Sequence, residues 1–396
     1  MKFKAEALFL LSAMPVYLDN AATTPMLPQV VDAMLPYMNE YFGNPSSSHS
    51  FGRKTKTAIE QARRAIASRL HVAPGTICFT SGGTEADNLA LYAAIEHQGC
   101  RRILTLPSEH TAVIKSVERY VQTSAATCTM IPMTETGHVD LSALDALLID
   151  GPKTIVSVMH GNNEVGIIQD IAAIGSICHS HGALFHSDTV QTIGHYPLDL
   201  SVLPVDFATC SAHKLHGPKG VGFLYVREGI KVGALILGGS QERAMRGGTE
   251  NLLGIVGLSE AIKSSFDHCE EHAGHIRGVK QHMVEGLKAA MPAVRFNAGS
   301  ERSSALYTVL NVSFPPHPKN GMLVFLLDLE GVACSGGSAC SSGSPRPSHV
   351  LEALGIHDPE RVAIRFSFSR LTTIEEVDYA VAACVRILGD SIQPDV

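Results

Sequence analysis

A chain of 396 residues is longer than one hydrophobic core usually supports, so we expect two domains. The formal net charge of −7 argues against nucleic acid as the main ligand, and no apolar run reaches the length of a membrane span. The nine cysteines form no C-x-x-C pair, which is typical of reduced thiols in the cytoplasm and not of a disulfide framework or a zinc knuckle.

The first residues allow two interpretations. Residues 1–15 form an extension whose short apolar stretch at 8–11 faintly resembles a signal peptide, although no clear cleavage site follows. Alternatively, Met14 is the natural start, because the first strand-like run begins at Val16. We favour the second interpretation and predict a cytoplasmic protein.

Strands and helices then alternate along the chain. Helices are predicted at 27–41 and 53–70, and later at 84–97, 110–121, 141–149 and 170–181. The predicted strands lie at 77–80, 103–107, 127–133, 154–160, 183–188, 205–210 and 221–226. This alternation predicts an α/β domain with a mostly parallel seven-stranded sheet that helices cover on both faces.

The remainder predicts a smaller α+β domain. Residues 252–291 have one long helical pattern that links the domains. Beyond it, strands at 305–314 and 361–369 mix with helices at 321–330, 348–354 and 373–388. We therefore expect a large domain at 16–265 and a small domain at 266–396, with residues 16–30 packing on the small domain as an alternative.

Polar residues cluster where predicted strands end. These groups are 81–84, Glu109 with His110, 160–163, Asp188 and Lys214. Ligands of parallel sheets bind beyond the carboxyl ends of the strands, so the sequence predicts one site at this edge.

Two of these groups predict charged ligands. Ser81-Gly-Gly-Thr84 joins a strand to a helix, and the free N–H groups there form an anion site, with a plain N-cap at Thr84 as the alternative. Asp188 ends an apolar strand, where a carboxylate needs a cationic partner. The alternative role for Asp188 is a helix N-cap.

Lys214 and Cys340 are the candidate nucleophiles. A lysine at the lip between two buried strands must pair, snorkel or lose its proton, and an unprotonated amine forms a Schiff base with an aldehyde. Cys340 stands among glycines and serines, which predicts an accessible thiol and not a core cysteine.

Three motifs together resemble the NifS/IscS-type cysteine desulfurases, which are pyridoxal-phosphate enzymes. They are Ser-Ala-His-Lys-Leu-His-Gly-Pro-Lys-Gly at 211–220, Ser-Gly-Gly-Thr-Glu at 81–85, and the Cys340 loop with its continuation at 347–355. The resemblance spans 16–390 and implies the fold-type I architecture, a homodimer and pyridoxal 5'-phosphate as cofactor. Cys334, Gly337 and the pair 345–346 depart from the family pattern, which puts in doubt how a sulfur acceptor docks on the Cys340 loop.

The resemblance also implies roles for individual residues. Lys214 holds the cofactor, His110 stacks on its ring and exchanges protons, and Cys340 is the catalytic thiol. The implied cofactor-binding residues are Gly83, Thr84, His110, Asn163, Asp188, Gln191, Ser211, His213, Lys214 and, from a neighbouring subunit, Thr249. Asn163 and Arg365 are candidates for the substrate carboxylate, and a buried structural salt bridge is an equal alternative for Arg365. No metal ligand is expected.

The implied reaction converts L-cysteine to L-alanine and leaves a persulfide on Cys340. An acceptor such as an iron–sulfur scaffold protein or a sulfur carrier would then take this sulfur, for clusters or thiolated cofactors and tRNA. A selenocysteine lyase or cysteine sulfinate desulfinase on the same fold is the nearest alternative. More remote are a catalytically silent assembly scaffold and a metallohydrolase using His179, His181, His186 and Asp188.

Overall fold

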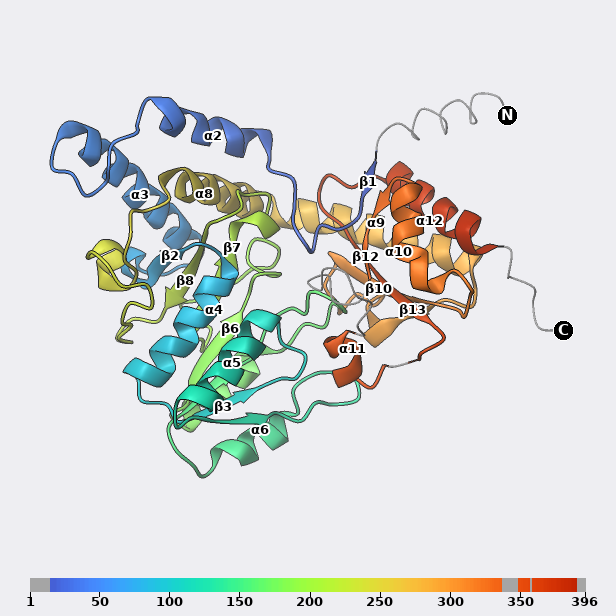
Figure 1. Ribbon diagram of the computed structural model, residues 1–396, viewed down its shortest axis with the longest axis horizontal. Coiled ribbons are helices and arrows are strands. Elements are labelled where there is room, and N and C mark those ends of the chain that lie inside the picture. Colours follow the sequence, from blue (N-terminus) through green and yellow to red (C-terminus); the bar gives the residue numbers. More distant parts are fainter. Residues whose placement is uncertain (1–14, 337–347, 357, 390–396) are drawn as a thin grey trace. The chain divides into compact units, whose positions relative to one another are not determined.

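The computed structural model describes residues 15–336, 348–356 and 358–389, and it divides into two compact units (Figure 1). The large unit comprises 24–162 and 168–269. The small unit comprises the described residues before 24, the short segment 163–167 and the described residues from 270 onward. The small unit is therefore assembled from three separate stretches of the chain.

The large unit is built on a seven-stranded sheet. Its strands are β2 (Ile77–Thr80), β3 (Arg102–Thr105), β4 (Thr127–Met130), β5 (Thr154–Ser157), β6 (Leu184–Asp188), β7 (Phe207–Ser211) and β8 (Gly222–Val226). Their order is β2-β8-β7-β6-β5-β3-β4. β8 pairs antiparallel with β2 and β7, and the other pairings in this sheet are parallel, so the predicted α/β fold with a mostly parallel sheet is confirmed.

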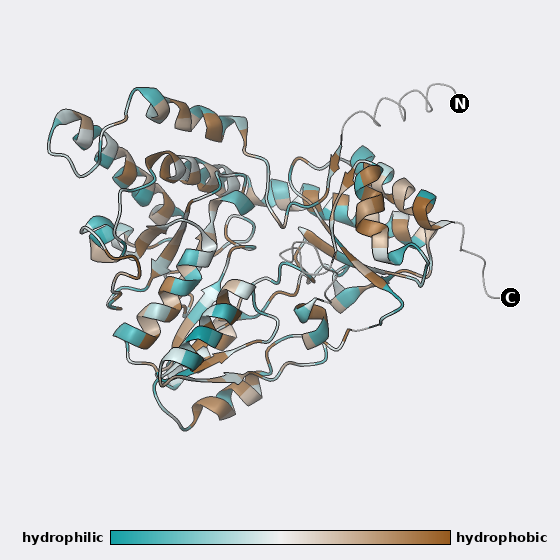
Figure 2. Ribbon diagram, viewed as in Figure 1, coloured by the Kyte–Doolittle hydropathy of each residue, from teal (hydrophilic) through white to brown (hydrophobic). Residues whose placement is uncertain are grey.

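Side chains that alternate along the strands enter two different apolar cores. Leu104, Val156 and Phe223 belong to one core. Their neighbours in sequence, including Ile103 and Ile155, belong to the other. Both faces of the sheet are therefore buried, as is usual for parallel sheets, and the central strands of Figure 2 are accordingly hydrophobic.

Helices cover this sheet. They are α2 (Pro28–Asn39), α3 (Ser50–Arg69), α4 (Gly83–Tyr92), α5 (Thr111–Thr123), α6 (Leu141–Leu148), α7 (Ile171–Ser180) and α8 (Leu252–Asp267). The helix predicted over 252–291 is in fact two helices, because His268 leaves the helical conformation with φ −126°. After this break α9 (Cys269–Ala290) begins, and it belongs to the small unit from Glu270 onward. Apolar periodicity did not predict the break, since the spacing continues through it.

The small unit contains a four-stranded antiparallel sheet. Its order is β12 (Ser335–Gly336), β13 (Val362–Ser367), β10 (Val309–Phe314) and β9 (Arg295–Phe296). Separately, β1 (Val16–Tyr17) pairs in parallel with β11 (Val332–Ala333).

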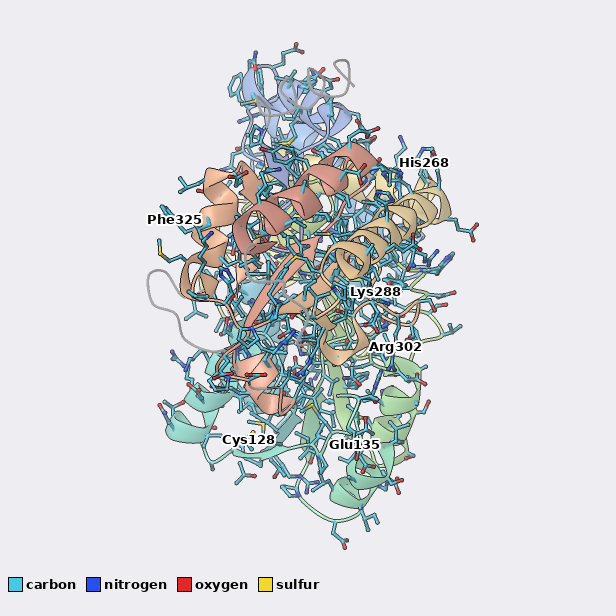
Figure 3. All side chains as sticks on the ribbon, turned by 90° about the vertical axis from the view of Figure 1, so that its right-hand side faces the viewer. Cys128, Glu135, His268, Lys288, Arg302 and Phe325 are labelled. Atoms are coloured by element: carbon cyan, nitrogen blue, oxygen red, sulfur yellow. The ribbon has the colours of Figure 1, made fainter. Side chains whose placement is uncertain are left out.

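The helices of the small unit are α9, α10 (Leu323–Leu329), α11 (His349–Ala353) and α12 (Ile374–Leu388). Phe325 projects outward from α10 in Figure 3 and is 54% exposed. Among the described helices of either unit, none combines the length and apolarity needed to cross a membrane.

Candidate active site

The turn between β2 and α4 has the backbone geometry of an anion site. Gly82 precedes the helix with φ 153°, a conformation that favours glycine. A Cβ on Gly83 would lie 2.9 Å from Cγ2 of Val190, so a side chain has no room there. Gly83 is the first helical residue and Thr84 the second, which shows that the N-cap interpretation of Thr84 is wrong. The first N–H groups of α4 have no partner within the helix and can bind an anion.

Ser211 and His213 come from the next segment of this edge. A Cβ built on Gly82 would lie 3.7 Å from Oγ of Ser211, so the end of β7 lies beside the glycine turn. His213 follows in a short 3₁₀ turn, Ala212–Lys214. Burial, assisted by the charges of Lys214 and Lys219, lowers the pKa of His213 to about 4, so its ring is neutral at pH 7.

The backbone around Lys214 is held from both sides. The amide and the hydroxyl of Thr24 donate to the carbonyl of His213 at 2.8 and 2.9 Å. Nε2 of His195 lies 3.4 Å from the carbonyl of Lys214. The Lys214 side chain is half-buried, so its amine projects from a fixed backbone at the edge of the sheet.

Asp188 ends β6 opposite Thr209 of β7 and is buried. Its Oδ1 accepts the N–H of Val190 at 2.9 Å, and a turn follows instead of a helix, so the N-cap interpretation is wrong. Burial first, and then the charge of Asp87, raise the pKa of Asp188 to about 6, while the charge of His110 opposes this rise. Gln191 is buried in the turn that follows.

His110 and Asp87 lie beside Asp188. One side-chain atom from each of the three lies within 4.8 Å of the others. His110 caps α5 through Nδ1, which accepts the N–H of Ala112 at 3.1 Å, so in the neutral ring the proton is on Nε2. Sequence reasoning missed Asp87, although its place on the buried face of α4 between Ala86 and Leu89 is a signal that could have found it.

Thr249 lines a small cavity of about 80 Å³ that also contacts Ser81 and Gly220 of the same chain. The contact of Thr249 with a neighbouring subunit stays a prediction.

The segment that leads to Thr249 is anchored by a buried ion pair. Nη1 and Nη2 of Arg63 contact the two carboxylate oxygens of Glu242 at 2.8 and 2.7 Å, and Glu242 also accepts the N–H of Phe79. Glu242, Arg243 and Ala244 all have positive φ, between 45° and 64°. Three consecutive left-handed residues cost conformational energy, which this buried pair offsets.

The small unit holds the other two predicted binding residues. The Arg365 side chain is buried, and its Nη2 lies 2.7 Å from Oδ1 of Asp19. Its Nη1 donates to the backbone carbonyl of Asn163 at 3.0 Å. Its Nε has no hydrogen-bond partner among the described residues. The structural salt bridge therefore exists, and it leaves the Nε–H of the guanidinium without a partner among the described residues.

Cys340 lies outside the described residues. Burial raises the pKa of most of the other thiols above its ordinary value; these are Cys78, Cys100, Cys128, Cys178, Cys210, Cys334 and Cys384. A thiol with a raised pKa is a poor nucleophile near pH 7.

The histidines of the metallohydrolase hypothesis have separate partners. His179 contacts Asp206 at 3.1 Å, and His181 contacts Asp145 at 2.8 Å. His186 bonds instead to Ser157 and Thr209. In the part of the chain that the structure describes, the one group of three side chains close enough to hold a metal ion is Asp87, His110 and Asp188, two of which are predicted cofactor residues.

Comparison with known proteins agrees with this geometry. The family model for aminotransferase class-V matches residues 16–380. The chain is 40% identical over 379 residues to a cysteine desulfurase IscS of Dictyoglomus turgidum, covering 94% of each chain. It is also 40% identical to a cysteine desulfurase IscS of Edwardsiella ictaluri, covering 95% of this chain and 93% of the other.

Two solved structures with related sequences also have a similar fold. A NifS-like protein superposes with a TM-score of 0.87 at 36% identity, covering 95% of this chain and all of the other. The structure described as SspA in complex with cysteine superposes with a TM-score of 0.76 at 30% identity, covering 90% and 99% of the two chains.

Gly83→Ala is expected to weaken anion binding at the start of α4 by about tenfold, or roughly 1.4 kcal/mol, because the new methyl group would press on Val190 and displace the first turn of the helix with its N–H groups. The measurement is the affinity for pyridoxal phosphate by fluorescence titration. Gly75→Ala is the matched control, since a Cβ at Gly75 meets nothing within 4 Å. Equal affinities of the two variants would contradict the assignment.

Glu242→Ala is expected to lower the free energy of unfolding by about 3–5 kcal/mol, because it leaves the Arg63 guanidinium buried without its carboxylate. Denaturant unfolding measures this change. Glu60 contacts the same arginine at 3.1 Å but is about one-third exposed, so Glu60→Ala should change stability by less than about 1 kcal/mol.

Proposed function

This chain belongs to the class-V aminotransferase family, and from that membership we infer that it is a cysteine desulfurase. It converts L-cysteine to L-alanine and transfers the sulfur to one of its own cysteines as a persulfide. The structural observation that carries this proposal is that Asp188 ends β6 and Lys214 follows the adjacent parallel strand β7, so both lie at carboxyl ends of strands. A buried carboxylate and a half-buried amine at one sheet edge are what a pyridoxal-phosphate enzyme requires.

Pyridoxal 5'-phosphate is the cofactor that these residues fit. When bound, it supplies an aldehyde for the amine of Lys214 and a ring that withdraws electrons from the substrate. The glycine turn at 82–83 leaves room for a phosphate, and Thr84, Ser211 and the neutral His213 would hold its oxygens. Thr249 would complete the phosphate site from the partner subunit.

The ring would be held by charge and stacking. Asp188 would face the protonated pyridine nitrogen, a cation that offsets the cost of burying its carboxylate. His110 would stack on the ring face, Gln191 would lie near the ring hydroxyl, and Asn163 would also contact the cofactor. These assignments agree with the buried positions of Asp188 and Gln191.

The chain's own groups would move protons and sulfur in a fixed order. Arg365 and Asn163 would bind the carboxylate of L-cysteine, and Lys214 or His110 would remove its α-proton. The thiolate of Cys340 would then attack the substrate sulfur. The carbon–sulfur bond breaks as the sulfur–sulfur bond forms, and L-alanine leaves after protonation.

An acceptor protein, such as an iron–sulfur scaffold or a sulfur carrier, would take the persulfide sulfur. A homodimer would be the working form, and exposed apolar side chains of the large unit support an interface; they are Val31, Leu35, Met38, Phe42, Phe51 and Leu237. The free thiols of the described cysteines suit the reducing cytoplasm. We also propose 16–265 and 266–396 as the large and small domains, with residues 16–30 packing on the small domain.

Lys214→Ala is expected to abolish the yellow colour of the purified protein and to lower sulfide release from L-cysteine by at least about a hundredfold, because the amine that holds the aldehyde is lost. Borohydride should fix the chromophore of the parent on Lys214, which peptide mass analysis detects. Lys219→Ala is the control, since Lys219 is an exposed lysine of the same loop. A Lys214→Ala protein that releases sulfide as fast as the parent would refute the proposal.

Cys340→Ala is expected to keep the bound chromophore but lower sulfide release from L-cysteine by at least about a hundredfold. Cys334→Ala, which removes a nearby thiol whose pKa burial has raised, should retain activity. Unimpaired turnover of L-cysteine by Cys340→Ala would favour the selenocysteine lyase or sulfinate desulfinase alternative, since neither needs this thiol.

A further inference from the structure

Three carboxyl groups of the large unit are buried together around the end of β6. Asp87 is 1% exposed, Glu109 is fully buried and Asp188 is 7% exposed. The charges of Asp87 and Asp188 both act on Glu109, and Asp87 acts on Asp188. Glu109 accepts the N–H of Met159 at 2.7 Å, and burial raises its pKa well above the usual range. The burial of Glu109 therefore disfavours its charged form.

Two histidines face this group, and His186 is the more deeply placed. Its Nδ1 lies 2.8 Å from Oγ of Ser157, and its Nε2 lies 3.1 Å from Oγ1 of Thr209 and 3.4 Å from Oδ1 of Asp87. Burial lowers the pKa of His186 to about 4, so the ring is neutral and does not compensate a charge on Asp87.

His110 is the second histidine, and its charge acts on Asp188. Neither Asp87 nor Asp188 forms an ion pair with a lysine or arginine anywhere in the described ranges. Oδ1 of Asp87 also has no hydrogen bond to a described residue. The two aspartates thus have too little positive charge around them for both to be ionised.

Two carboxylates this close in a buried site repel each other, so their protons are lost in two separated steps. Burial raises the pKa of Asp87 to about 7, against a small opposing effect of the hydrogen bond with Thr209. The pKa of Asp188 is raised to about 6 for the reasons given above. Near neutral pH the pair therefore retains about one proton.

We propose that Asp87 is a positioning residue for Asp188: the two carboxyl groups share one proton, which Asp87 holds as a neutral acid while Asp188 carries the charge that faces the cofactor. This role rests on the proposed cofactor, because the protonated ring nitrogen draws the negative charge to Asp188. Asp87 does not touch the reacting atoms. Because it is neutral, Asp87 places no second negative charge near the ring, and its carboxyl group holds the proton that the pair shares.

The test uses the cofactor-free protein, so it succeeds or fails independently of the cofactor assignment. An aspartate in the unfolded chain has a pKa near 3.8, and Asp87 in the folded chain has one near 7. Between these values the folded protein holds a proton that the unfolded chain has lost, so its stability is complete at low pH and falls as the pH rises. The Asp87–Asp188 pair should therefore contribute a fall in the melting temperature of the parent between pH 5 and pH 8. Buried neutral histidines such as His186 contribute a rise up to about pH 6.5, so the contribution of the pair is isolated by comparing the parent with a variant.

Asp87→Asn keeps the shape of the neutral acid and removes the titration. Its melting temperature should fall less than that of the parent over pH 5–8, by a difference of about 3 °C or more. Equal pH dependence in the two proteins would overturn the shared proton. Glu242→Gln is the matched control, because Glu242 is a buried carboxylate with the cationic partner Arg63 at 2.7 Å. This control should be destabilised across the whole pH range without a flatter slope.

If Asp87→Asn does not fold, a second measurement tests whether the Asp87–Asp188 pair holds a proton. Infrared spectra of the parent with carbon-13 in the aspartate carboxyl groups separate aspartic acid bands from those of Glu109. Asp87 and Asp188 are the described aspartates whose pKa is raised, so a protonated aspartate band at pH 7 would come from this pair. Absence of that band in the parent would overturn the proposal, and its persistence after loading with pyridoxal phosphate supports it.

Discussion

The chemistry of the large unit depends on the burial of a negative charge at the end of β6. Asp188 has lost most of its contact with water, and two further carboxyl groups, Asp87 and Glu109, are buried nearby. A carboxylate in such a place is stable only beside a cation or with a proton. The same unfavourable environment that raises the pKa of Asp188 favours a positively charged group beside it.

The sheet determines which groups share this edge. β6 and β7 are parallel neighbours, and the pairing of Asp188 with Thr209 brings the turn that carries Lys214 to the same edge. The antiparallel β8 adds Gly222, opposite Thr80 of β2, next to the glycine turn. Glycines at these positions let three backbones approach each other, and this close approach leaves the start of α4 accessible to an anion.

In the small unit, a buried arginine is paired with a carboxylate. Arg365 lies on a central strand of its sheet, and its guanidinium is fixed by Asp19 and by the carbonyl of Asn163. Ser335 donates to the same Oδ1 of Asp19 at 2.8 Å. One carboxylate therefore aligns the arginine and the strand that precedes the Cys340 segment. A planar guanidinium held in this way has already lost most of its side-chain freedom on folding.

The sequence alone determined the α/β class, the strands of the large sheet and the edge at which polar groups gather, because strand alternation and glycine turns are local signals. It also predicted the two nucleophiles, Lys214 and Cys340, whose motifs are continuous in the chain. The tertiary structure decided what surrounds each charge. Asp87 next to Asp188, and Asp19 next to Arg365, are pairs of residues separated by 101 and 346 positions, and no local pattern encodes their proximity.

The helix break at His268 could not be predicted from the sequence either, because the apolar spacing continues on both sides of the single residue that leaves the helical conformation. Burial and long-range electrostatics depend on the packed fold, so the protonation of this site could be inferred only after the chain was folded.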